Sequence, residues 1–168
     1  LNASSSAVPT SGLIPLTVDF AGSATGGTPP YSFSWDFGDG GSSSAQNPSH
    51  TFMTLGSFSV VLTVTDYESH VAASEPIIIS ANSGAANKLV FTQSPSGGVG
   101  GALWATQPIV EVQDALGYTV TSDDSTVVTL AIANNPGNGS LSGLFSMTVT
   151  DGIATFVDLS IDKGGWGY

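Results

Sequence analysis

Apolar and polar residues alternate most regularly between residues 31 and 40. Four aromatic residues of this stretch share one parity: Tyr31, Phe33, Trp35 and Phe37. Serines and Asp36 stand between them, and this period of two predicts a half-buried strand with its aromatic face against a core. Gly38-Asp39-Gly40 follows and predicts a tight turn, because Gly tolerates positive φ and Asp-Gly is a preferred hairpin turn. A tryptophan fills much of the gap between two packed sheets, so we expect Trp35 to be buried.

Further alternating stretches predict neighbouring strands in the first half of the chain. Residues 16–20 carry apolar side chains at every second position, and the pattern returns from Phe58 over 58–65. Glycines and prolines cluster over 21–30 and predict a loop there. A last strand is expected over 70–80.

The second half of the chain begins the pattern again after a short break. Small and polar residues over 81–86 predict a linker between a first β-sandwich over 1–80 and a second over 87–168. Six strands are expected in the second sandwich: 87–93, 107–114, 117–121, 126–132, 145–150 and 153–161. The predicted fold class is therefore all-β, with two tandem immunoglobulin-like β-sandwiches.

The strand count predicts that the second sandwich is incomplete at its C-terminus. An immunoglobulin-like sandwich generally contains seven or more strands. We therefore expect an apolar face that includes Leu130, Phe156 and Leu159 to be partly uncovered. Three explanations stay open: the polypeptide continues beyond Tyr168, a neighbouring chain donates the missing strands, or the sandwich is a six-stranded variant.

Composition narrows the range of partners. Only 9% of the 168 residues are charged, Lys88 and Lys163 are the only basic residues apart from histidine, and the net charge is −11. Nucleic-acid binding is disfavoured because phosphate neutralisation needs clustered Lys or Arg. The apolar runs are too short to insert into a membrane. Without cysteine there is no disulfide, zinc–thiolate site or thiol nucleophile.

Asp36 and Asp39 are the most conspicuous paired carboxylates. Hydrogen bonding to backbone N–H groups of the turn is the first interpretation, and calcium ligation is the second. A general acid–base pair is a third, but we assign no histidine to it, and His50 is interpreted as a strand-edge residue. No Gly-x-Ser-x-Gly elbow occurs, so we expect no enzymatic activity and no required cofactor.

Other polar and aromatic residues have weaker functional interpretations. Six further turn aspartates are expected to be solvated, with a weak calcium site between loops as the alternative: Asp114, Asp123, Asp124, Asp151, Asp158 and Asp162. Trp104 and Trp166 are candidate ligand-binding residues, since exposed rings can stack on sugars. For Trp104, burial at the end of the sandwich is the competing interpretation.

The hexapeptide Trp35-Asp36-Phe37-Gly38-Asp39-Gly40, with His50-Thr51-Phe52 downstream, resembles the PKD domain, the immunoglobulin-like module named after polycystic kidney disease protein. The resemblance covers residues 1–80. It implies a β-sandwich in which five residues are structural: Trp35, Phe37, Gly38, Gly40 and Phe58.

Residues 86–168 resemble bacterial immunoglobulin-like repeats of surface and secreted proteins. Lys88-Leu89-Val90-Phe91 and Gln107-Pro108-Ile109-Val110 are two of the similar stretches. Together the two resemblances imply a non-catalytic extracellular module, secreted or at a cell surface, that works as spacer, adhesion or filament unit. Its partners would be surface proteins, polysaccharides, or neighbouring copies and domains. The alternative is an accessory module of a secreted hydrolase.

Overall fold

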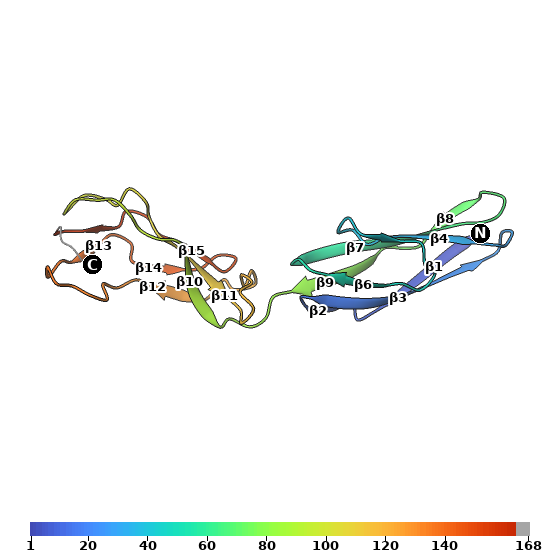
Figure 1. Cartoon of the computed structure of the whole chain (residues 1–168), viewed down its shortest axis with the longest axis horizontal. Coiled ribbons are helices and arrows are strands. Elements are labelled where there is room, and N and C mark those ends of the chain that lie inside the picture. The colour runs from blue at the N-terminus through green and yellow to red at the C-terminus, as the bar shows by residue number, and fades with distance from the viewer. Residues whose placement is uncertain (164–168) are drawn as a thin grey trace. The chain divides into compact units, whose positions relative to one another are not determined.

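The computed structural model describes residues 1–163, which form strands, turns and loops with no helix. Accordingly, these residues include no helix that could cross a membrane. The chain divides into two compact units, one over Leu1–Asn82 and one that begins at Ser83 (Figure 1). The predicted all-β class is confirmed.

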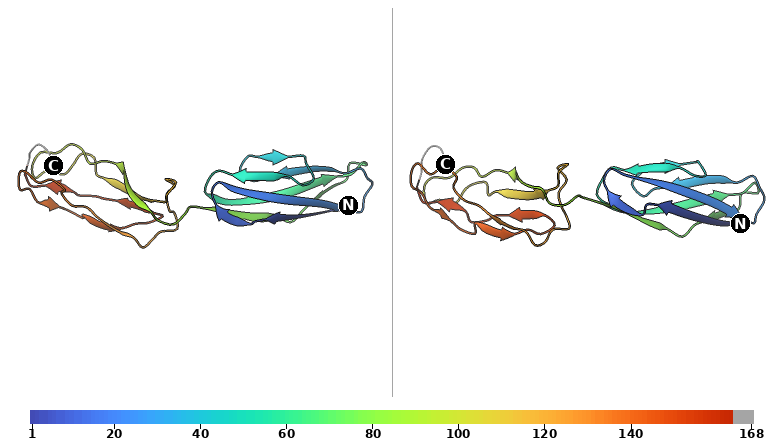
Figure 2. Two further views of the ribbon diagram at one scale, coloured as in Figure 1. Left: turned by 60° about the horizontal axis from the view of Figure 1, so that its bottom comes forward. Right: turned by 90° about the horizontal axis from the view of Figure 1, so that it is seen from below.

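The first unit contains two β-sheets that enclose a core (Figure 2). The three-stranded sheet has the order β1 (Asn2–Val8), β3 (Leu16–Thr25) and β6 (Ser49–Phe52). The six-stranded sheet has the order β2 (Ser11–Leu13), β9 (Ile77–Asn82), β7 (Gly56–Thr65), β4 (Ser32–Asp36) and β5 (Ser42–Ser43), with β8 (Val71–Ala73) also paired with β7. β2 and β9 are parallel, and the other pairs are antiparallel.

The aromatic strand β4 supplies the largest side chain of this core. Trp35 is 1% exposed, and its ring centroid lies 5.3 Å from that of Phe20 in the other sheet. Trp35 also lies opposite Leu62 of β7, so the two side chains share the inner face. The alternation therefore predicted the buried face correctly, although Tyr31 and Phe33 of the same parity are only partly buried.

The loop predicted over 21–30 was wrong in its first half, because β3 continues to Thr25 and pairs with β1 along the extension. Gly22 lies within this strand. A Cβ atom there would lie 2.9 Å from the Leu62 side chain and 3.1 Å from the Trp35 ring. The glycine therefore lets the core side chains approach the strand closely, and it does not mark a loop.

The strand predicted over 70–80 is two strands, β8 and β9, separated at residues 74–76. Ser74 is buried in this break, where its hydroxyl accepts a hydrogen bond from the Leu62 N–H at 3.2 Å and donates to the Glu75 carbonyl at 3.1 Å. β9 then continues to Asn82. Ala81 and Asn82 therefore belong to a sheet and not to the linker expected over 81–86.

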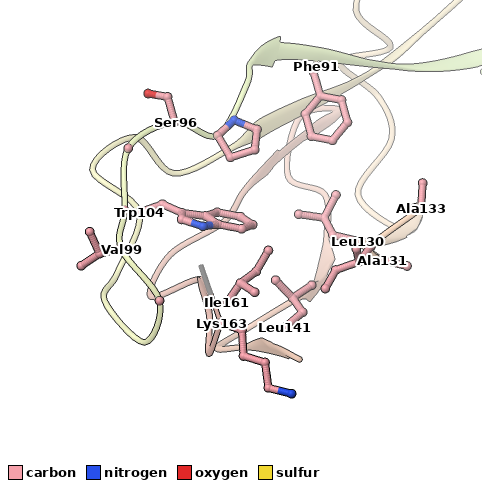
Figure 3. Close-up of a pocket in the computed structure, with 15 residues that line it drawn as sticks. Phe91, Ser96, Val99, Trp104, Leu130, Ala131, Ala133, Leu141, Ile161 and Lys163 are labelled. Carbon is pink, nitrogen blue, oxygen red and sulfur yellow. The ribbon is translucent and has the colours of Figure 1, made fainter. Parts of the chain in front are cut away.

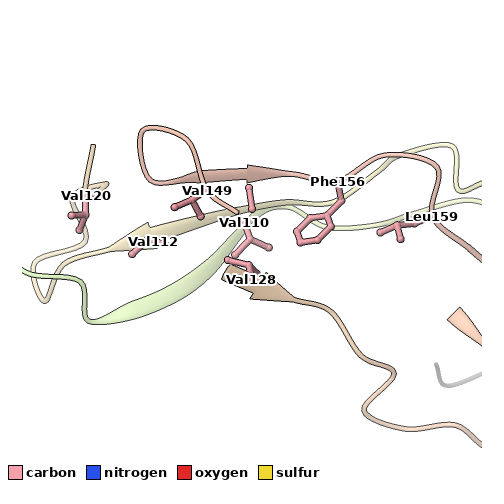
Figure 4. Close-up of a cluster of buried hydrophobic side chains, with 8 residues drawn as sticks. Val110, Val112, Val120, Val128, Val149, Phe156 and Leu159 are labelled. Atoms are coloured by element: carbon pink, nitrogen blue, oxygen red, sulfur yellow. The ribbon is translucent and has the colours of Figure 1, made fainter. Parts of the chain in front are cut away.

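The second unit consists of shorter strands. β10 (Lys88–Gln93), β11 (Ile109–Gln113) and β15 (Ile153–Thr155) form a three-stranded antiparallel sheet. β12 (Val127–Thr129) pairs with β14 (Ser146–Thr148), and β13 (Leu141–Ser142) pairs with β16 (Ser160–Ile161). The core cluster contains eight buried residues (Figure 4): Val110, Val112, Val120, Val128, Val149, Ala154, Phe156 and Leu159.

Two strand predictions for this unit were wrong in detail. No strand forms over 117–121, where the chain turns back after β11 and only an isolated bridge joins Gln113 to Thr119. The strand expected over 153–161 is interrupted between β15 and β16. Asp158 has a φ of +59° at this interruption, and Phe156 and Leu159, which have opposite parities, are both buried. The interruption shifts the alternation of inward and outward side chains by one residue, as a β-bulge does. Phe156 and Leu159 can therefore both point inward.

The prediction that Leu130, Phe156 and Leu159 lie on a partly uncovered face was wrong. Phe156 and Leu159 are fully buried, and Leu130 is partly buried. On the sheet face that carries the buried Val110 and Val112, Leu89 and Phe91 of β10 remain uncovered, at 53% and 51% exposed. The opening of this unit therefore lies along β10.

Gly38 and Gly40 offer a matched test of the turn after β4. Both have positive φ, +77° and +91°, but a Cβ at Gly38 would lie 2.8 Å from the Ser59 carbonyl oxygen, whereas one at Gly40 would meet nothing within 4 Å. We expect Gly38→Ala to lower the free energy of unfolding by about 2–4 kcal/mol and Gly40→Ala by only about 1 kcal/mol. Urea unfolding of the two variants measures the difference, and equal losses would contradict the close approach.

Candidate functional site

The turn after β4 brings a histidine to one of the two predicted carboxylates. His50 Nε2 lies 2.7 Å from Asp39 Oδ2. The imidazole also stacks on the Phe37 ring, with centroids 4.0 Å apart and planes inclined by 7°. His50 does lie in the edge strand β6, as predicted, but the expectation that no histidine could be assigned to the paired carboxylates was wrong. The pair joins residues 11 positions apart, and only the packing of β6 beside the turn brings them together.

Both predicted carboxylates bind the backbone of their own turn. Asp36 Oδ1 accepts a hydrogen bond from the Gly38 N–H, and Asp39 Oδ1 accepts one from the Gly41 N–H, both at 2.9 Å. Desolvation opposes ionisation of Asp39, but the hydrogen bonds from His50 and Gly41 outweigh it and lower the pKa of Asp39. Residues 1–163 contain no group of three or more His, Cys, Asp or Glu side chains that could hold a metal ion. The observed hydrogen bonds agree with the turn interpretation, and calcium ligation stays a prediction.

The residues expected to be structural lie near the His50–Asp39 pair and the turn after β4. Phe37 is buried, and the Trp35 indole N–H donates a hydrogen bond to the Ala45 carbonyl at 3.0 Å. Phe58 is partly buried and stacks on Phe52 with centroids 4.8 Å apart. These contacts join β4, β6 and β7 into one aromatic core.

A second carboxylate arrangement, which the sequence did not reveal, occurs once in each unit. Asp66 follows β7 and Asp114 follows β11. In both cases Oδ1 accepts hydrogen bonds from the N–H groups two and four residues later, at 2.9–3.0 Å. Oδ2 accepts a hydrogen bond from a distant segment, from Thr28 at 3.0 Å and from Gly84 at 2.8 Å respectively. Each carboxylate therefore holds a tight turn and ties another segment to it.

The two turns also share a backbone conformation. The residue three positions after the aspartate has positive φ in both, Ser69 at +69° and Gly117 at +93°. A sequence pattern could have found them: an aspartate directly after an alternating strand, with a turn-forming residue three positions later. The sequence does not show, however, which distant N–H group completes the arrangement.

Two of the turn aspartates expected to be solvated are in fact buried. Asp114 is 4% exposed and Asp123 is 8% exposed. Asp123 accepts hydrogen bonds from the backbone N–H and the hydroxyl groups of both Ser125 and Thr126. The expectation of solvated carboxylates was wrong at these two positions, because neighbouring donors replace water.

Hydrogen bonding lowers the pKa of these buried carboxylates below the ordinary aspartate value. For Asp66, desolvation opposes ionisation, but hydrogen bonds from the N–H groups of Thr28 and His70 and from the His70 ring outweigh it and lower the pKa to about 2. For Asp123, hydrogen bonds from the Thr126 hydroxyl and from the backbone of Ser125 and Thr126 lower the pKa to about 2. The N–H of Gly84 contributes most to the lowered pKa of Asp114.

These lowered pKa values predict a specific loss of stability in acid. The folded values of about 2 lie below the ordinary aspartate value of 3.8, so the ionised carboxylates stabilise the fold fully above about pH 4. Their contribution is lost as the pH falls towards 2. We expect urea midpoints to fall across this window, and Asp66→Asn and Asp123→Asn variants to be less stable at pH 7 with a smaller fall between pH 4 and 2. An unchanged pH dependence in both variants would contradict this assignment.

Trp104, one of the two candidate ligand-binding tryptophans, lines an open pocket of about 470 Å³ in the second unit (Figure 3). The ring is partly buried and packs against the core cluster. Phe91, Leu130 and Ile161 also line the pocket, and among the lining residues within 1–163 only Lys163 is charged. Trp104 is therefore neither a fully buried side chain nor an exposed stacking platform. Trp166 lies outside the described residues.

Comparison with known proteins found a family match within the first unit. Residues 7–81 match the family model of the PKD domain, as the aromatic hexapeptide predicted. The chain is also 29% identical to a microbial collagenase of Vibrio alginolyticus over 147 residues. That match covers 80% of this chain and 18% of the collagenase, so the chain spans a small part of the length of this curated relative. The resemblance of the second unit to bacterial immunoglobulin-like repeats stays a prediction.

Proposed function

We propose that this chain is a non-catalytic accessory module of a secreted hydrolase, which holds its enzyme on an insoluble protein or polysaccharide. The similarity to the microbial collagenase carries the proposal. Because it covers 80% of this chain, and each unit accounts for about half of the chain, the similarity extends into both units. It covers only 18% of the collagenase, so most of the length of that protein lies outside the similar segment. A segment of this kind suits a supporting role within a larger enzyme.

The contacts of the two histidines support a non-catalytic role. His50 pairs with Asp39 at 2.7 Å, and His70 Nδ1 lies 3.2 Å from Asp66 Oδ2. Within residues 1–163, no serine or threonine hydroxyl forms a hydrogen bond with either imidazole. An activated hydroxyl nucleophile needs such a base within hydrogen-bonding distance. Both aspartates also bind turn N–H groups, which is a structural task.

A spacer or adhesive role at the cell surface is the second candidate function. It is favoured by the division of the chain into two compact units, the first of which matches the PKD family model. A spacer needs folded units in series and no ligand of its own. The two functions therefore differ in whether the chain alone binds a substrate surface.

Co-sedimentation of the purified chain with insoluble substrates separates the two functions. We expect saturable binding to fibrillar collagen, chitin or cellulose, and no release of soluble fragments from the bound material. An unrelated protein of similar net charge controls for non-specific retention. Absence of binding to all three materials would contradict the accessory role and favour the spacer. Release of fragments that a single substitution abolishes would contradict the non-catalytic assignment itself.

A further inference from the structure

Hydrogen bonds within each unit anchor the chain on both sides of Ser83. β9 of the first unit ends at Asn82, whose carbonyl accepts a hydrogen bond from the Ile14 N–H at 3.0 Å. In the second unit the Gly84 N–H donates a hydrogen bond to Asp114 Oδ2 at 2.8 Å. Ser83 is the only residue between these two anchors. The connection between the units is therefore short, because both flanking residues belong to the hydrogen-bonded structure of a unit.

Residues 84–87, which we call the entry segment, are also held at their far end. The Asn87 N–H donates a hydrogen bond to the Gln113 carbonyl at 2.8 Å, and β10 begins at the next residue and pairs with β11. Ala85 and Ala86 lie between the two hydrogen bonds and are exposed. The entry segment is therefore a short strap at the end of β11 that is fixed at both ends and exposed in its middle.

Asp114 is a well-fixed anchor because its own turn holds it. Its Oδ1 accepts hydrogen bonds from the Leu116 and Tyr118 N–H groups at 2.9 Å, and its N–H donates to the Tyr118 carbonyl at 2.9 Å. Oδ2 then accepts the Gly84 N–H. That N–H contributes most to the lowered pKa of Asp114, so the ionised carboxylate binds the entry segment better than a protonated one would.

Close packing adds a second, steric feature to this contact. A Cβ atom at Gly84 would lie 3.3 Å from both the Cβ and the Oδ2 of Asp114. Because glycine lacks this atom, the backbone of the entry segment can approach the carboxylate closely enough to donate its N–H. A bulkier residue at this position would push the segment away from Asp114.

We propose that Asp114 docks the entry segment on the second unit and thereby protects the connection between the units from proteolysis. Proteases cut preferentially in exposed segments of small residues that can leave the folded structure. Ala85 and Ala86 suit serine proteases of the elastase type, which cleave after small apolar side chains, but cleavage requires release of the segment. This inference goes beyond the accessory role proposed above and does not depend on it, because every contact involved lies within one unit.

Digestion of the whole chain with elastase tests the proposal, with cleavage within 83–87 followed through the masses of the fragments. Each rate is divided by that of a short peptide with the same residues 80–90, which corrects for the sequence preference of the protease. In Asp114→Asn the remaining oxygen stays with the two N–H groups of the turn, so an NH2 group that cannot accept faces Gly84. Cleavage should accelerate about tenfold or more, because it follows the population of the released segment.

Asp66→Asn is the matched control. It makes the same change in the corresponding turn of the first unit, where the carboxylate ties Thr28 and not the entry segment. It should leave the rate of cleavage within 83–87 unchanged. Equal acceleration by Asp66→Asn would show that general destabilisation opens the connection, and it would overturn the proposal.

Two further measurements distinguish release of the entry segment from unfolding of the second unit. In Asp114→Asn the Gly84 amide should exchange about tenfold or more faster, while the amides of β11 and β15 stay protected. Gly84→Val leaves the Asp114 turn intact but prevents the close approach, so it should accelerate cleavage to a similar extent even where Asp114→Asn loosens the sheet. Unchanged cleavage in either variant would overturn the proposal, as would cleavage of the unaltered chain as fast as the short peptide.

Discussion

Trp35→Ala is expected to lower the free energy of unfolding of the first unit by about 3–5 kcal/mol, a large part of the stability of a small domain. The indole is 1% exposed and packs against Phe20 and Leu62. Its removal leaves a cavity that the surrounding strands can fill only in part. It also removes the donor that satisfies the Ala45 carbonyl.

Urea unfolding of the whole chain, followed by amide NMR signals of β4 and β7, measures this effect within the first unit. Signals of the second unit serve as an internal reference. Trp35→Phe is the matched control, because it keeps a ring in the core, and it should cost about 1–3 kcal/mol. An alanine variant within 1 kcal/mol of the unaltered chain would show that Trp35 does not support the core.

The second large effect is expected at Phe156, in comparison with Phe91 of the same unit. Phe156 is fully buried and Phe91 is 51% exposed. Phe156→Ala should therefore cost about 3–5 kcal/mol, whereas Phe91→Ala should cost about 1 kcal/mol or less. Both variants remove the same atoms, so their difference reports how far the unit encloses each ring.

The same urea titration, followed through signals of β11 and β15, measures both variants. A loss at Phe91 as large as that at Phe156 would mean that something covers β10 in solution. Repeating the titration at several protein concentrations then identifies self-association, because only a shared interface makes the midpoint depend on concentration.

The recurrence of the Asp66 and Asp114 turns follows from local chemistry. A carboxylate at the end of a strand accepts N–H groups two and four residues later because the turn itself presents them. The distant donors differ, since Thr28 lies between two strands and Gly84 precedes the first strand of its unit. Similar turns in the two units thus have different roles in tying the chain together.

Local patterns in the sequence determined the fold class and most of the first core. The alternation around Trp35 places its ring on the inner face whatever the strand pairs with, because neighbouring side chains point to opposite sides. The turn at Gly38 and Gly40 follows from residues that tolerate positive φ. The same local patterns predicted the match of residues 7–81 to the PKD family model.

Tertiary structure decided what depends on residues distant in the sequence. Gly22 was mistaken for a loop residue because only the packed Leu62 and Trp35 side chains require a glycine in that strand. His50 acquired Asp39 as a partner, and Asp114 became buried, through contacts that no local pattern encodes. Leu89 and Phe91 have the alternation of a covered strand, and their exposure depends on how many strands stand on the facing side. Parity determines the face that a side chain occupies, but only the assembled sheets determine whether that face is covered.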